Sequence, residues 1–288
     1  MMNAWFNALL RRRAEEMVSA ICKLRDTRAG SPATLESRSG SEWIPIACKE
    51  PGSIITQEEI DRLPEPARRY FALARVVGKP RPESFSIIME GRIRNGPTSR
   101  WMPMVMRQFN RVDQPSRIVY IESPGTPMAG IDSLIEGKGR MLIRLFGLVT
   151  LSDVQGPEMS QSALVTFLND LVLCPAAYFS VPLEWKSIDG ERCALRLSWA
   201  GMMVTAELEV DETGRLRNWT SADRYADVKG QVLPDRWSTP FSESMQEIEG
   251  CLVPSSGKGI HDYDGNPYVY VELDRIHDLL LNATWLPA

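Results

Sequence analysis

The sequence predicts a mainly β (α+β) protein with one large curved antiparallel sheet or half-barrel, a helix crossing it, and a helical region at the N-terminus. From residue 84 onward, apolar and polar side chains alternate with the period of two that is typical of strands. Turn sequences such as Asp189-Gly190 and 211–214 join successive strand candidates. Because the strands follow one another without regularly intervening helices, an antiparallel sheet is expected.

The first 53 residues are expected to lie before the main domain. Residues 4–25 predict an amphipathic helix, with apolar side chains at roughly helical spacing beside Arg11, Arg12 and Arg13. Residues 26–53 are polar and rich in Gly, Ser and Pro, which favours a flexible arm. We therefore expect a helix and arm over residues 1–53, followed by a single antiparallel β-rich domain over 54–288.

That domain is expected to begin with a helical entry segment. Thr56 and Glu59 stand at capping-box spacing, and Pro66 can serve as the first residue of a second helix. The alternation then predicts a strand from residue 84, followed by strands at 101–109, 117–123, 130–136, 139–150, 183–189, 192–199, 202–210, 215–225, 236–246 and 267–273. A helix is predicted over 160–173.

Composition and motifs exclude several function classes. The 33 Lys+Arg against 37 Asp+Glu give a net charge of −4, which argues against a nucleic-acid partner. No apolar run reaches the length of about 18 residues that spans a bilayer. The two histidines and five scattered cysteines show no metal-ligand spacing, and no Gly-x-Gly-x-x-Gly follows a strand. We expect no metal, no cofactor and reduced cysteines.

The expected compartment is the cytoplasm. The apolar stretch near the N-terminus precedes the arginine run, which reverses the order of a secretory signal, and it is too short for one. The short basic helix at 4–25 could instead contact an anionic membrane surface peripherally, or pack on the domain or a partner subunit.

The candidate ligand-binding residues lie in strands that are apolar on both faces. Met102, Met104 and Met106 share one face of a strand that also carries Trp101, and Arg144 interrupts another apolar strand. Methionine adapts to bound molecules of variable shape, and Arg144 could contact a ligand head group. Two alternatives stay open, an ordinary two-sided core for the methionines and an ion pair of Arg144 with Asp132, Glu136 or Asp153.

Several motifs resemble an uncharacterised bacterial family, a domain of unknown function. They are Leu63-Pro64-Glu65-Pro66-x-Arg68-Arg69-Tyr70, Trp101-Met102-Pro103, Gly137-x-Gly139-x-Met141 and Trp237-Ser238-Thr239-Pro240-Phe241. The resemblance implies a long antiparallel sheet with a helix laid across it, similar in outline to periplasmic lipoprotein carriers, and it supplies no catalytic residues. The chain departs from the family pattern at Asn169-Asp170, where Glu is expected, and at His261, where Trp is expected.

Three functions follow as hypotheses. The first is a non-enzymatic protein that binds an apolar or amphiphilic small molecule on a concave sheet face. The second is an enzyme, a hydrolase or cyclase, that uses carboxylates such as Asp132, Asp153 and Glu158 as acid and base. The third is a structural or regulatory partner protein that acts through its N-terminal helix.

Overall fold

The computed structural model describes residues 2–23, 42–46, 49–228 and 230–287. Within these residues, fourteen strands form one antiparallel sheet in the order β1-β8-β9-β10-β11-β12-β15-β16-β2-β3-β4-β5-β6-β7. The strands are β1 (Ile44–Pro45), β2 (Ser84–Ile93), β3 (Met102–Arg111), β4 (Ser116–Glu122), β5 (Met128–Ile135), β6 (Lys138–Leu145), β7 (Val149–Gln155), β8 (Leu183–Ser187), β9 (Arg192–Trp199), β10 (Met202–Val210), β11 (Leu216–Val228), β12 (Gln231–Pro240), β15 (Gly257–His261) and β16 (Tyr268–Leu281). A separate hairpin pairs β13 (Met245–Ile248) with β14 (Cys251–Pro254). The predicted fold class is confirmed.

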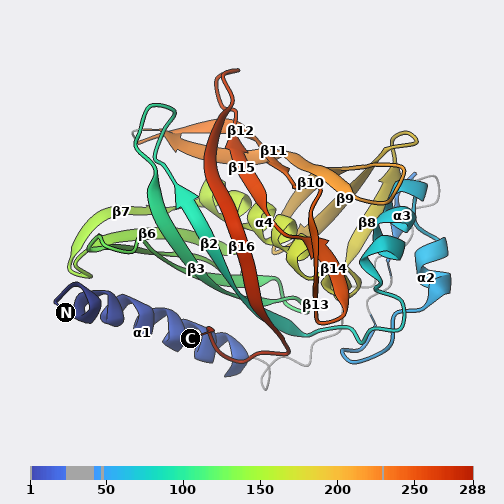
Figure 1. Cartoon of the computed structure of the whole chain (residues 1–288), viewed down its shortest axis with the longest axis horizontal. Coiled ribbons are helices and arrows are strands. Elements are labelled where there is room, and N and C mark those ends of the chain that lie inside the picture. Colours follow the sequence, from blue (N-terminus) through green and yellow to red (C-terminus); the bar gives the residue numbers. More distant parts are fainter. Residues whose placement is uncertain (1, 24–41, 47–48, 229, 288) are drawn as a thin grey trace.

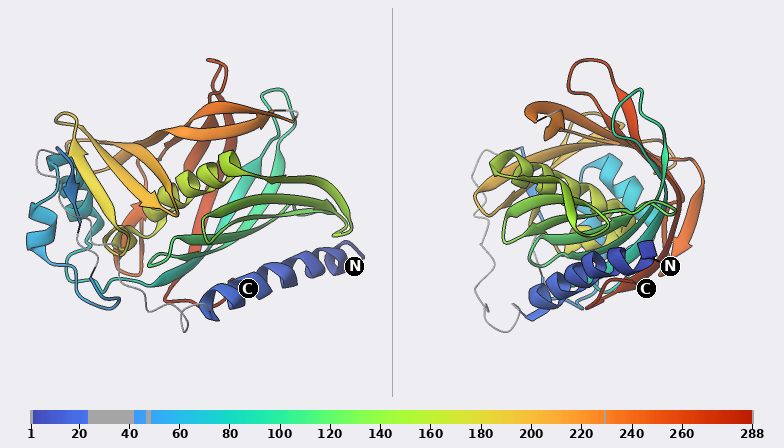
Figure 2. Two further views of the ribbon diagram at one scale, coloured as in Figure 1. Left: turned by 180° about the vertical axis from the view of Figure 1, so that it is seen from behind. Right: turned by 90° about the vertical axis from the view of Figure 1, so that its left-hand side faces the viewer.

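The sheet curls strongly, and the helices lie on both of its sides (Figures 1 and 2). The helices are α1 (Met2–Lys23), α2 (Gln57–Asp61), α3 (Glu65–Ala74) and α4 (Pro157–Asp170), with the short 3-10 turns η2 (Leu171–Leu173) and η3 (Pro175–Phe179) continuing α4. Helix α4 contacts β5, β6 and β7 near one edge of the sheet and also β10 and β11 nearer the other. It therefore crosses the concave side and joins two distant parts of the curled sheet.

The close approach of α4 to β6 depends on one glycine. A Cβ at Gly139 would lie 2.5 Å from the backbone oxygen of Met159, so any larger residue would push the helix away. The Gly139 amide also donates a hydrogen bond to the Ser160 hydroxyl at 2.9 Å. The neighbouring Glu136 and Gly137 have positive φ angles and form the short turn implied by the strands predicted at 130–136 and 139–150.

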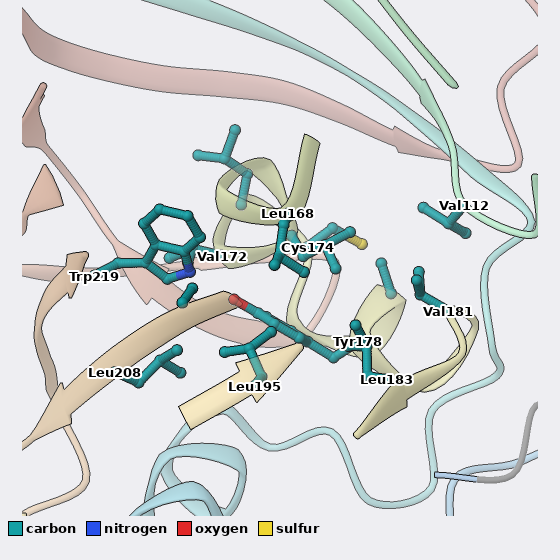
Figure 3. Packing of buried hydrophobic residues seen from close by; sticks show 14 of the residues in the cluster. Val112, Leu168, Val172, Cys174, Tyr178, Val181, Leu183, Leu195, Leu208 and Trp219 are labelled. Atoms are coloured by element: carbon teal, nitrogen blue, oxygen red, sulfur yellow. The ribbon is translucent and has the colours of Figure 1, made fainter. Parts of the chain in front are cut away.

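The main core fills the space between α3, α4 and the concave face. Leu168 and Val172 of the crossing segment pack with Tyr178, Leu195 and Trp219; Figure 3 shows these side chains with their neighbours in this core. The aromatic rings of Phe71, Tyr178 and Trp185 contact one another with centroids 5.5–5.8 Å apart, and the two pairs that include Phe71 are edge-to-face. This end of the curled sheet is filled by side chains.

Helix α1 packs on the convex face. Leu10, Ala14, Val18 and Ile21 are buried against strand residues that include Ile131. Leu9, next to Leu10 in the sequence, is 47% exposed and lies outside this buried face. The helix thus packs on the domain through its apolar face, and none of the described helices is long and apolar enough to cross a membrane.

Several boundaries differ from the sequence-based expectation. Ile44–Pro45, placed in the arm, pairs with Trp185 and Glu184 of β8. Residues 24 and 25 of the predicted helix and residues 26–41 and 47–48 of the predicted arm lie outside the described residues. The expected single strand 139–150 is two strands, because Phe146 and Gly147 both adopt positive φ and reverse the chain. The crossing helix begins at Pro157 rather than Ser160, and strands β1 and β15 lie outside every predicted strand range.

Candidate functional site

The predicted methionines line the concave face of the sheet. In the strand ladders Met106 lies opposite Met89 of β2 and Ile121 of β4, and Ile121 in turn lies opposite Gly130 of β5. Met89 belongs to the main core, so this cross-strand row faces inward. Because alternate residues of a strand share a face, Met102 and Met104 point the same way.

The other two predicted residues lie on the convex face. The Trp101 ring stacks under the guanidinium groups of Arg92 and Arg94, at 4.9 and 4.6 Å from the ring centroid. Arg144 follows Ile143, which lies opposite Gly130, and so points outward. The structure brings the three methionines together but places Trp101 and Arg144 on the opposite surface.

Arg144 is bound locally through a backbone group. Its Nη1 donates to the carbonyl of Gly147 at 3.2 Å. Two of the carboxylates considered as its partners pair elsewhere, Asp132 with Arg117 and Asp153 with Arg140 at 2.7 Å. Arg144 therefore lacks the inward position that contact with a ligand on the concave face would require.

An apolar wall covers the inner face of strands β3 to β6. It consists of Met102, Met104, Met106, Ile121, Met141 and Ile143. Met104 is buried, whereas the other five keep part of their surface exposed. A partly exposed apolar surface on the concave side of a sheet suits contact with an apolar molecule.

A buried ion-pair network lies below this wall. The Arg117 guanidinium on β4 pairs with Asp132 of β5 and, at 2.9 Å, with Asp170 at the end of α4. The Asn110 amide also donates to Asp170 at 3.2 Å, and Gln108 donates to Asn110 at 2.8 Å. Burial raises the pKa of Asp170 above its ordinary value, although Arg117 and these hydrogen bonds oppose the rise.

A second group of polar side chains, the Arg224 cluster, lies on the inner face of β11, β12, β15 and β16. It comprises Arg224, Asp235, Trp237, His261 and Tyr270. The Arg224 guanidinium lies 4.0 Å above the Trp237 ring, and Arg224 stands opposite Asp235 in the strand ladder. Cation–π stacking on Trp237 compensates part of the cost of burying the guanidinium charge.

His261 is held by Asp235 and by aromatic rings. Its Nδ1 lies 2.6 Å from Asp235 Oδ2, and Asp262 donates its backbone amide to the other oxygen at 2.8 Å. Ring centroids of Trp237 and Tyr270 lie 4.9 and 4.8 Å from the imidazole. Burial lowers the pKa of His261, with the hydrogen bond to Asp235 acting in the opposite direction. The neutral imidazole must donate its Nδ1 proton, because an ionised carboxylate only accepts.

The end of α4 connects the two polar groups. The Asn169 side-chain oxygen accepts hydrogen bonds from Trp237 Nε1 at 3.1 Å and Thr239 Oγ1 at 2.7 Å. The next residue, Asp170, binds Arg117 on the other side of the concave face. Two consecutive helix residues thus position side chains from strands far apart in the sheet.

Some buried atoms of this site have no protein partner. Among the described residues, none accepts a hydrogen bond from Nε or Nη1 of Arg224, and none donates to Oδ1 of Asp132. These atoms are inaccessible to solvent. Buried charged groups are normally hydrogen-bonded, although buried polar atoms without a protein partner also occur elsewhere among the described residues, for example at Arg107 and Arg144.

Sequence reasoning missed most of this site. Of the carboxylates considered for acid–base chemistry, Asp132 lies in it, while Asp153 pairs with Arg140 on the convex face and Glu158 lies in the first turn of α4. Arg117, Arg224 and Asp235 each occupy a buried or half-buried inward position of a strand. The sequence signal is alternation, since Arg117 is in phase with Val119 and Ile121. Which of these positions meet across the concave face depends on the curvature of the sheet.

Comparisons with known proteins give one family and a distant structural likeness. Residues 53–273 match the model of a family described as a family of unknown function, DUF6544. A solved structure similar to this chain is a DUF1329 family protein from Desulfovibrio piger, with 11% identity and a TM-score of 0.38, over 70% of this chain and 86% of that one. No curated protein matches.

Proposed function

Because the chain belongs to the DUF6544 family of unknown function, we propose from the site alone that it is a non-enzymatic protein that binds an apolar or amphiphilic small molecule on the concave face of its sheet. The family match confirms the resemblance to an uncharacterised domain family. The proposal concerns the role of the concave face, which the family description leaves open.

One observation carries the proposal: a partly exposed apolar wall and buried polar groups without protein partners share the concave face. Met102, Met106 and Ile143 provide adaptable apolar surface, and Arg224 provides unpaired donors. A site of this composition suits a molecule with an apolar part and a polar end, since binding pockets are mostly apolar with few placed polar groups. The cysteines Cys174, Cys193 and Cys251 are buried and free, which supports a cytoplasmic setting for this role.

The test compares two neighbouring residues of β3 that point in opposite directions. Met106 and Val105 are both half-buried, and they lie on the concave and convex faces. Met106→Gln should weaken binding of the fluorescent apolar probe N-phenylnaphthylamine several-fold, whereas Val105→Gln should leave it unchanged. Native mass spectrometry of the wild-type protein should in addition show a co-purified small molecule.

The outcomes separate the hypotheses. Probe binding that responds equally to both substitutions would show that the probe binds outside the concave face. No probe binding, together with no co-purified molecule, would contradict the proposal.

A second candidate is an enzyme, and the His261–Asp235 pair favours it. Asp235 fixes the imidazole through Nδ1, which is how a carboxylate orients a histidine base. Such an enzyme would use His261 as its base instead of the carboxylates Asp153 and Glu158. Turnover of an amphiphilic ester that disappears in His261→Gln, while probe binding persists, would favour this candidate.

A further inference from the structure

The turn between β6 and β7 presents an exposed apolar surface. Leu148, Val149 and Leu151 are 62%, 56% and 54% exposed, and no residue from 145 to 152 is charged. Among the described residues, no other segment of four contains three exposed large apolar side chains. Exposed apolar side chains that stand singly are ordinary, whereas a group of them marks a contact surface for a protein or a membrane. We call Leu148, Val149 and Leu151 the hairpin tip.

The hairpin tip continues the apolar wall to the rim of the concave face. Val149 lies opposite Leu145 of β6, and Leu145 lies opposite Met128 of β5. Met128 is in phase with Gly130, whose partner Ile143 belongs to the wall, so this row faces the concave side. All three residues of the row keep part of their surface exposed. The tip therefore lies where the apolar wall reaches the outside of the molecule.

Helix α1 begins at the same end of the sheet. The Ile21 carbonyl accepts a hydrogen bond from Arg111 Nη1 at 2.9 Å, and the Asn7 carbonyl accepts one from the Tyr120 hydroxyl at 3.3 Å. The N-terminal half of the helix thus lies over the end of β4, and the ladder through β5 leads from there to the end of β6. Figures 1 and 2 show the start of α1 beside the β6–β7 hairpin.

The exposed side of this helix half is basic. Its apolar side chains, such as Leu10 and Ala14, are buried against the sheet and cannot also enter a membrane. Arg12 and Arg13 are exposed, and residues 2–16 carry three arginines against two glutamates. The helix therefore contributes positive charge rather than apolar surface to this end of the molecule.

The strand ends around the hairpin tip add to the positive charge. Arg144 Nη1 donates to the Gly147 carbonyl at 3.2 Å, which holds the guanidinium at the turn. Carboxylates on the neighbouring strands are neutralised by ion pairs, Glu122 by Arg107 at 2.6 Å and Asp153 by Arg140 at 2.7 Å. An exposed apolar tip surrounded by excess arginine charge is complementary to an anionic lipid surface.

A protein strand fits this surface less well. Although β7 is the last strand of the sheet and an edge strand can pair with another strand, its register with β6 shifts where Thr150 and Ser152 pair with consecutive residues. Such a bulge distorts an edge and disfavours further pairing. In addition, Leu148 lies in the turn itself, outside the strand that a partner would extend.

We propose that the hairpin tip inserts into the surface of an anionic lipid bilayer, where Arg12, Arg13 and Arg144 contact lipid phosphates. This inference is independent of the proposed small-molecule site. Since the tip is the rim of the concave face, the docked orientation brings the apolar wall next to the bilayer.

Flotation of the full chain with lipid vesicles tests the insertion. We expect binding to vesicles of equal parts phosphatidylcholine and phosphatidylglycerol. Leu148→Asp should lower the partition coefficient about tenfold or more, because an apolar side chain is lost and a repelled charge is added. Ile188→Asp is the matched control, since Ile188 is 39% exposed in the β8–β9 turn toward the other end of the molecule (Figure 1), and it should leave flotation unchanged.

A second pair of variants tests the contribution of charge. The double variant Arg12→Gln, Arg13→Gln should lower the partition coefficient about tenfold. Its control is Arg62→Gln, Arg68→Gln, because these arginines are exposed on α2 and α3 and Arg62 pairs with Glu58 as Arg12 pairs with Glu16. Added salt and vesicles of phosphatidylcholine alone should both weaken binding of the wild type. Thermal unfolding verifies that each variant folds.

Three results would overturn the proposal. The first is no flotation of the wild type with the anionic vesicles. The second is an equal reduction by Leu148→Asp and Ile188→Asp, which would show that the protein binds lipid through another surface. The third is a dimer in analytical ultracentrifugation that Leu148→Asp dissociates while flotation is unaffected, which would assign the hairpin tip to a second copy of the chain.

Discussion

Arg117 on β4 and Asp170 at the end of α4 form a buried ion pair, with Nε and Oδ2 2.9 Å apart. The contact joins the crossing helix to the strand ladder on one side, while Asn169 binds Trp237 on the other. Because α4 is tied to both sides, these contacts fix the spacing between the apolar wall and the Arg224 cluster. The geometry of the concave site therefore depends on this helix end.

The Arg117 pair predicts a large stability loss on substitution. Arg117→Leu leaves the carboxylates of Asp132 and Asp170 buried without their cation, and the free energy of unfolding should fall by about 3–5 kcal/mol. The control Arg140→Leu breaks a pair with Asp153 whose side chains are 32% and 33% exposed, and should cost at most about 1 kcal/mol. Urea denaturation measures both. Similar losses in the two variants would contradict the structural role of the network.

Met104 and Met102 should differ in stability although they share a face. Met104 is only 2% exposed, and Met104→Ala should lower the free energy of unfolding by about 2–5 kcal/mol because it creates a cavity. Met102 is half-buried, and Met102→Ala should cost less. Denaturant titrations of the two variants give the comparison. A stability unchanged by Met104→Ala would indicate that this part of the wall is not packed against other side chains.

The packing of α1 can be tested with adjacent leucines. Leu10 is 2% exposed under the helix and Leu9 is 47% exposed. Leu10→Ala should destabilise the protein by about 2–5 kcal/mol, whereas Leu9→Ala should stay within about 0.5 kcal/mol of the wild type. Thermal and urea unfolding report both values. If neither substitution alters unfolding, the helix is not part of the cooperative unit.

His261 should make stability depend on pH. Burial lowers its pKa in the folded state below the ordinary value of about 6.5, so the unfolded chain takes up a proton first as pH falls. Its contribution to the free energy of unfolding is therefore complete above about pH 6.5 and is lost progressively below it. The slope of unfolding free energy against pH should be shallower in His261→Gln below about pH 6.5. Equal slopes in the two proteins would rule out this effect.

The local features of this protein follow from short segments of its sequence. Alternation in 84–93 and 102–106 predicted strands and placed the three methionines on one face. The Thr56 capping box and the short connection between the strands predicted at 130–136 and 139–150 were likewise readable, because each depends on interactions within a few residues. The distribution of apolar side chains along single elements was sufficient for the fold class.

Which side chains form the site depends on contacts between strands that are distant in the chain. Alternation shows that Ile143 and Arg144 point in opposite directions, but the register from β3 to β6 decides which of them joins Met106. The end of α4 reaches both Trp237 and Arg117 because twist accumulated over many strands curls the sheet, a property of the whole assembly. Contacts between residues so distant in the chain depend on packing and curvature, which no single segment encodes.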